Sequence, residues 1–144
     1  MAHARAMLDA HPREFGFPAE HLAAAIEACF DCAQTCTACA DACLGEDDVA
    51  SMRRCITSDL NCSDICVATG RVLSRQTDYD AAVTQRALES CIRACTVCAD
   101  ECDKHAQHHR HCAICAEVCR ACAAACAALL DDEVEEEMRA LQGG

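Results

Sequence analysis

Cysteines recur at steps of three, four or seven residues along four separate stretches of the chain, and this spacing constrains the fold more than any other feature. Steps of three and four residues follow one face of an α-helix, the face that packs inward in a helical bundle. All 17 cysteines fall on these stripes: Cys29, Cys32, Cys36, Cys39, Cys43; Cys55, Cys62, Cys66; Cys91, Cys95, Cys98, Cys102; Cys112, Cys115, Cys119, Cys122, Cys126. The spacing predicts four helices that present thiols to a common core.

Proline and glycine place the ends of these helices. Gly16 and Pro18 mark a loop after a short helix at about 2–9, and Pro18 fits the first turn of the helix that follows. The four Cys-bearing helices are expected over about 18–44, 47–75, 78–105 and 108–130, with Gly45 ending the first of them.

The helices account for the whole chain as one domain over 1–144, a length that suits a single core. Long helices with short connections predict an all-α fold, an antiparallel four-helix bundle over 18–130 with a Cys-lined core. A short helix and loop at 1–17 precede the bundle. The acidic sequence DDEVEEEMRALQGG at 131–144 predicts a short amphipathic helix with Leu130, Val134, Met138 and Leu141 on one side.

The composition limits the possible binding partners and the expected cellular compartment. The formal net charge of −12 argues against binding to nucleic acid or to anionic membranes, which require a basic face. The N-terminus has no apolar run of signal-peptide length, and no segment approaches the roughly 20 apolar residues of a membrane span. We therefore expect a cytoplasmic protein, in which many cysteines indicate thiolates for metal or redox work rather than disulfides.

The number of thiols argues against a purely structural role. Cysteine in place of leucine forfeits on the order of 1 kcal/mol of burial free energy per site. Over 17 sites this loss rivals the whole stability of a domain, about 5–15 kcal/mol. Thiolates three or four residues apart can hold one ion between adjacent helical turns, with a further thiolate from a facing helix. The stripes therefore indicate a metal-binding core.

The arrangement along straight helices favours a soft monovalent cargo, Cu(I), with multiple ions per chain. Two other metal functions remain open. Sequestration of Zn(II) or Cd(II) in the manner of a metallothionein would require tetrahedral sets of ligands, and an iron–sulfur electron carrier usually wraps its cluster in loops. A disulfide scaffold and a thiol redox enzyme fit less well. No catalytic motif is present, so we do not expect an enzyme.

The two ends of the predicted core differ. At one end the stripes continue into Leu22, Leu73, Leu88 and Leu129, which predict an apolar plug. At the other end lie Glu46, Met52, His105 and His108, with His111 adjacent, and Asp59 takes the stripe position between Cys55 and Cys62. Thioether, imidazole and carboxylate bind Cu(I) more weakly than thiolate, so they could admit ions and pass them inward. As alternatives to a role in metal binding, the histidines could form a solvated loop and Met52 could simply pack against the core.

Beyond the stripes, the segment SDLNCSDIC and the pairs Lys104–His105 and His111–Cys112 resemble the cytosolic branch of the bacterial copper storage proteins. The resemblance covers about 20–130. It implies a bundle filled with Cu(I), assembly into a homotetramer and copper entry at the His-bearing end, with a cytosolic copper chaperone as a candidate delivery partner. The loop HAQHHRHC is longer and richer in histidine than the shortest such loops of the family.

Overall fold

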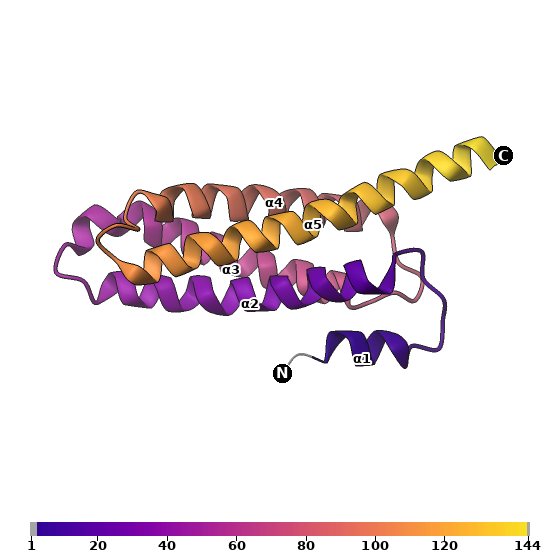
Figure 1. Ribbon diagram of the computed structural model, residues 1–144, viewed down its shortest axis with the longest axis horizontal. Coiled ribbons are helices and arrows are strands. Elements are labelled where there is room, and N and C mark those ends of the chain that lie inside the picture. The colour runs from indigo at the N-terminus through magenta and orange to yellow at the C-terminus, as the bar shows by residue number, and fades with distance from the viewer. Residues whose placement is uncertain (1–2, 144) are drawn as a thin grey trace.

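The computed structural model describes residues 3–143. The elements are the helices α1 (Ala4–Asp9), α2 (Ala19–Leu44), α3 (Arg53–Leu73), α4 (Ala81–Asp103) and α5 (Arg110–Gly143), and the 3₁₀ helix η1 (Val49–Met52). Successive long helices run in opposite directions in an elongated bundle (Figure 1). Helices α2 and α4 each pack against both α3 and α5. The predicted all-α bundle is confirmed, and no strand occurs in residues 3–143.

The helix ends follow local sequence signals. Pro18 lies at the N-cap of α2 rather than inside it, and Gly45 closes this helix with its N–H bonded to the carbonyl oxygens of Asp41 and Ala42. Helix α3 begins later than predicted, because residues 49–52 form the tighter turn of η1. Helix α4 begins after Asp80, whose Oδ1 accepts a hydrogen bond of 2.9 Å from the backbone N–H of Val83. The short N-terminal helix is α1; Ala2, predicted to begin it, lies outside the described residues.

The acidic tail is helical, but the prediction of a separate short helix is wrong, because the tail continues α5 without a break. Residues 110–142 contain no proline or glycine, and alanine and glutamate are strong helix formers. The start of the tail is held to the bundle by three polar contacts: His21 Nδ1 to Asp132 Oδ2 at 2.6 Å, Tyr79 Oη to Glu133 Oε2 at 3.4 Å and Gln85 Nε2 to Glu137 Oε1 at 2.6 Å. Its end extends past the bundle (Figure 1).

A glycine inside α3 allows this helix to approach α2 closely. A Cβ atom at Gly70 would lie only 2.9 Å from Cζ of Phe30 on α2. The absence of a side chain at this position therefore leaves room for the Phe30 ring between the two helices. This contact offsets the low helix propensity of glycine.

One stretch of α5 is long and apolar enough to span a membrane by length and composition alone, contrary to the sequence-based expectation that no segment approaches one. Its apolar character comes from alanine and cysteine. All five cysteines of α5 are buried, and this helix packs against α2 and α4. The cysteine-bearing face of the stretch therefore belongs to the bundle core, although only 33% of the stretch is buried.

Candidate metal centre

The bundle core is lined by 17 cysteine side chains, all buried and all free thiols. Each of the four long helices contributes at least three of them, as the stripes predicted. Neighbouring sulfurs lie 3.5 Å apart for Cys36 and Cys119 and 4.0 Å apart for Cys115 and Cys119. These distances are far longer than the ~2.05 Å of a disulfide bond, so the thiols meet without being bonded to one another.

Groups of three sulfurs from different helices form triangles of metal-binding size. Cys29 on α2, Cys91 on α4 and Cys126 on α5 have Sγ–Sγ distances of 3.9, 3.8 and 3.8 Å. The centre of such a triangle lies about 2.2 Å from each sulfur, close to the ~2.3 Å of a metal–thiolate bond. The geometry therefore suits an ion bound by thiolates from three helices.

Neighbouring groups share their sulfurs. Cys36 Sγ lies 3.8 Å from Cys32, 3.5 Å from Cys119 and 3.7 Å from Cys115, which belong to two adjacent triangles. Cys32 likewise belongs to two groups of four thiols, one with Cys66, Cys95 and Cys122 and the other with Cys36, Cys62 and Cys119. Because one thiolate can bridge two ions, a continuous network of this kind can hold more ions than separate four-cysteine sites would.

The protonation state of the thiols affects loading. Burial raises the pKa of Cys43 to about 12, and it also raises the pKa of Cys112. Thiols with raised pKa values are protonated near neutral pH. Metal binding at these positions must therefore release protons.

Asp59 of α3 places a carboxylate among the thiols. Its side chain is fully buried, and its Oδ1 lies 3.0 Å from Cys98 Sγ, 3.3 Å from Cys115 Sγ and 3.5 Å from Cys102 Sγ. Burial is the largest cause that raises its pKa to about 8. In the metal-free protein the carboxyl group is thus mostly protonated at neutral pH and surrounded by thiols that can donate to it.

The two ends of the core differ as the sequence predicted. At one end the four predicted leucines are fully buried: Leu22, Leu73, Leu88 and Leu129. At the other end Met52 is also fully buried, directly before α3. His111 lies next to the thiols there, with Nδ1 3.4 Å from Cys39 Sγ and 3.6 Å from Cys112 Sγ. His111, Cys39, Cys43 and Cys112 form one compact group of potential ligands.

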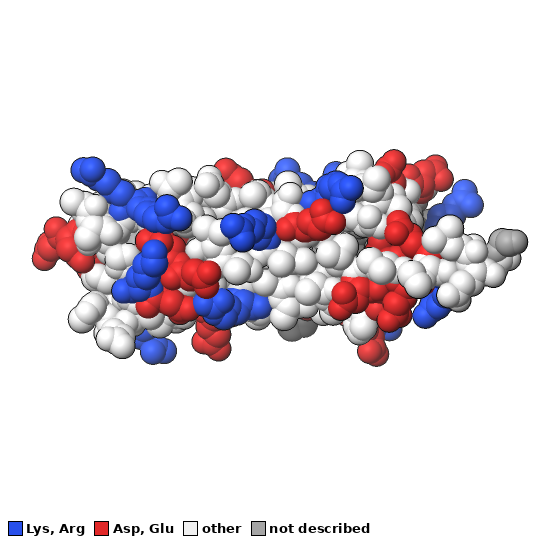
Figure 2. Space-filling view, turned by 90° about the horizontal axis from the view of Figure 1, so that it is seen from above, with Lys and Arg blue, Asp and Glu red and all other residues white. Residues whose placement is uncertain are grey.

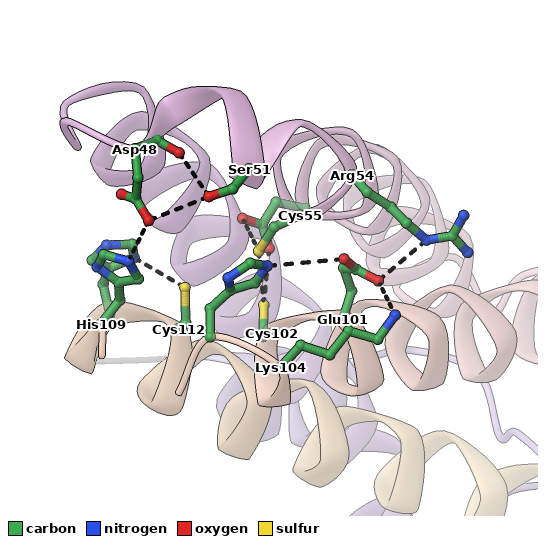
Figure 3. Close-up of polar contacts among 12 residues, drawn as sticks. Asp48, Ser51, Arg54, Cys55, Glu101, Cys102, Lys104, His109 and Cys112 are labelled. Atoms are coloured by element: carbon green, nitrogen blue, oxygen red, sulfur yellow. Dashed lines mark hydrogen bonds and ion pairs between the residues drawn. The ribbon is translucent and has the colours of Figure 1, made fainter. Parts of the chain in front are cut away.

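A buried carboxylate lies beside His105 at the same end. Glu101 accepts hydrogen bonds from Arg54 Nε at 3.1 Å and Lys104 Nζ at 2.9 Å, and its Oε1 lies 4.0 Å from His105 Nε2 (Figure 3). Metal-ligating histidines commonly have their second nitrogen held by a carboxylate. At 4.0 Å this pair is beyond hydrogen-bond distance, so Glu101 places a carboxylate near the His105 ring without holding it.

The loop before α5 does not arrange its histidines as predicted. His108 is exposed and lies outside the group around His111. His109 instead points into this end, with only 13% of its side chain exposed, and its ring centroid lies 5.6 Å from that of His111. His109 was not among the candidate ligands, because HAQHHRH is too short a pattern to show which rings the loop turns inward.

The surface carries charges of both signs. On the face shown in Figure 2, lysine and arginine side chains alternate with aspartate and glutamate, and uncharged residues lie between them. This face has no extended basic field of the kind that nucleic acids require.

Comparisons with known proteins point in one direction. Residues 18–131 match the family described as copper storage protein. None of the curated proteins matches the chain.

Solved structures of one bacterial protein share both fold and sequence with the chain. The copper storage protein Ccsp from Streptomyces lividans, loaded with 10 copper equivalents, is 48% identical; the match covers 90% of this chain and 98% of that protein, with a TM-score of 0.88. The same cytosolic protein with five coppers is 54% identical over 78% of this chain and 93% of that one, with a TM-score of 0.77.

Proposed function

The chain belongs to the copper storage protein family, and from this premise we propose that it stores and sequesters many Cu(I) ions in the cytoplasm on the thiolates lining its bundle. The observation that carries the proposal is the network of 17 buried, unbridged thiols whose sulfurs form triangles of metal-binding size. Loading of the 48% identical Streptomyces protein with 10 copper equivalents supports the same cargo.

The proposed ligands have different roles. The 17 cysteines are the storage ligands, and Asp59 lies among them close enough to join an ion bound by Cys98 or Cys115. Met52, His105 and His111 lie at the end of the core opposite the four buried leucines, called the open end below. Their weaker soft and borderline donors would receive ions there before the thiolates do. We do not include His108, because its side chain is exposed.

Storage of Cu(I) has more support than sequestration of another metal, electron transfer or catalysis. The family match and the copper-loaded relatives favour Cu(I) over Zn(II), Cd(II) or an iron–sulfur cluster. The family's role is storage rather than catalysis, which agrees with the proposal that the chain is not an enzyme. Assembly into a homotetramer and delivery of copper by a cytosolic chaperone remain predictions.

An anaerobic copper titration tests the proposal. The fully reduced, metal-free protein is titrated with Cu(I) beside a chromogenic Cu(I) chelator. We expect the chelator to stay colourless until about ten ions per chain are bound, because the 48% identical Streptomyces protein is loaded with 10 copper equivalents. Colour after the first one or two equivalents would show that the thiols serve another metal or another chemistry.

Histidines at the open end should govern the rate of loading. In the double variant His105→Ala and His111→Ala, we expect uptake of Cu(I) to slow several-fold while the final capacity stays nearly unchanged, because the thiolates remain. The growth of Cu(I)–thiolate absorption after rapid mixing measures both quantities. His108→Ala is the matched control and should load like the wild type. Equal uptake rates in the double variant and the wild type would refute this role.

A further inference from the structure

At the open end of the bundle, nitrogen and oxygen donors face one another beside the thiol network. We propose that His109, His111 and Glu46 form a separate site for one divalent cation of borderline softness, such as Zn²⁺. Glu46 Oε1 lies 3.3 Å from His109 Nδ1 and 3.1 Å from His111 Nε2. A single carboxylate oxygen thus faces one nitrogen of each imidazole.

These separations match those between the ligands of a small divalent ion. Zinc bonds to histidine nitrogen and carboxylate oxygen are about 2.0–2.2 Å long, which sets the ligand atoms of a tetrahedral ion about 3.3–3.6 Å apart. Two histidines and one glutamate form a known type of zinc ligand set that leaves the fourth position to water. The two imidazoles also lie close to each other, with their ring centroids 5.6 Å apart.

The second nitrogen of each imidazole is also held, as is usual for metal-ligating histidines. His109 Nε2 lies 3.3 Å from Asp48 Oδ2, and Ser51 Oγ holds the same carboxylate oxygen at 3.2 Å (Figure 3). His111 Nδ1 faces the thiols of Cys39 and Cys112 at 3.4 and 3.6 Å. Both rings can therefore keep a proton on the held nitrogen and offer the other nitrogen to an ion at Glu46.

The donor set separates this site from the copper network by its chemistry. Imidazole and carboxylate suit divalent ions such as Zn²⁺, whereas thiolates in the core suit Cu(I). The ligands also come from two segments: Glu46 lies between α2 and η1, whereas His109 directly precedes α5 and His111 lies in its first turn. A bound ion would tie these two segments together across the open end.

Cobalt(II), a spectroscopic substitute for Zn²⁺, tests the site in the reduced, metal-free protein near neutral pH. Binding to nitrogen and oxygen alone gives visible d–d absorption without sulfur-to-cobalt charge-transfer bands. We expect the first equivalent per chain to give this signature, because Glu46 Oε1 already faces one nitrogen of each imidazole at the end of the bundle, whereas all the thiols are buried inside it. Charge-transfer bands from the first equivalent onward would overturn the proposal.

Variants identify the ligands. Glu46→Gln should weaken binding of the first Co²⁺ at least ~100-fold, and Asp48→Asn, which only orients His109, should weaken it about tenfold. His108→Ala, in the same loop but exposed, should bind like the wild type, and circular dichroism checks that each variant is folded. Unchanged binding by Glu46→Gln would overturn the site. Since Cu(I) capacity is measured in a separate titration, failure of this site and failure of copper storage are distinguishable.

Discussion

The reduced protein loaded with ten equivalents of Cu(I) should unfold more than about 20 °C above the metal-free protein. A ligand that binds only the native state at 100 times its Kd adds about 2.7 kcal/mol per site. For a chain of this size, each kcal/mol raises the unfolding midpoint by about 3–4 °C. Three occupied sites therefore suffice for the expected rise, and the thiol network offers several more.

The unfolded chain also contains thiols that bind copper, and this reduces the gain. It does not remove the gain, because sulfurs such as those of Cys36 and Cys119 come within 3.5 Å only when α2 packs against α5. Thermal unfolding followed by helical circular dichroism under anaerobic conditions measures the shift. Added Mg²⁺ is the control, since it binds thiolates poorly, and it should leave the midpoint nearly unchanged. An unchanged midpoint with copper still bound would place the ions outside the native core.

The bundle could be predicted because one residue type marks the core face of every helix. The stripes place Cys29 to Cys43 on a single face of α2, and the leucines that continue them fall at the closed end, where Leu22 and Leu129 are fully buried. The end of α5 could not be predicted in the same way. The change from the alanine-rich to the acidic sequence suggested a new helix, but a change of polarity without proline or glycine does not end one.

The residues of the candidate site could likewise be predicted from the sequence only where they follow the helical period. Asp59 could be placed among the thiols, because its position follows the helical period between Cys55 and Cys62. His108 and His109 could not be told apart, because residues 104–109 form a connection whose path has no such period. The signal that distinguishes them lies on another segment: Glu46 and Asp48, across the open end, face both nitrogens of His109.

Asp59→Asn should make the metal-free protein more stable than the wild type near pH 8 and leave the two equal near pH 4. In the folded protein burial raises the pKa of Asp59 to about 8, against about 3.9 in an unfolded chain. Between these values the folded state binds more protons than the unfolded state, so the stability of the wild type falls as the pH rises. A difference of about four pKa units sets an upper limit of about 5 kcal/mol on this loss.

The difference in unfolding free energy between Asp59→Asn and the wild type isolates Asp59 from other groups that titrate in the same direction. One such group is the buried Glu133, whose pKa is also raised by burial. Anaerobic denaturant unfolding of the reduced proteins from pH 4 to pH 8 measures this difference. Asp64 is an exposed aspartate on the same helix, and the control variant Asp64→Asn should follow the wild type. If the unfolding free energies of Asp59→Asn and the wild type changed in parallel with pH, the surrounding thiols would stabilise the buried carboxylate fully. Cys98, with Sγ only 3.0 Å from Oδ1, would then be the first donor to test.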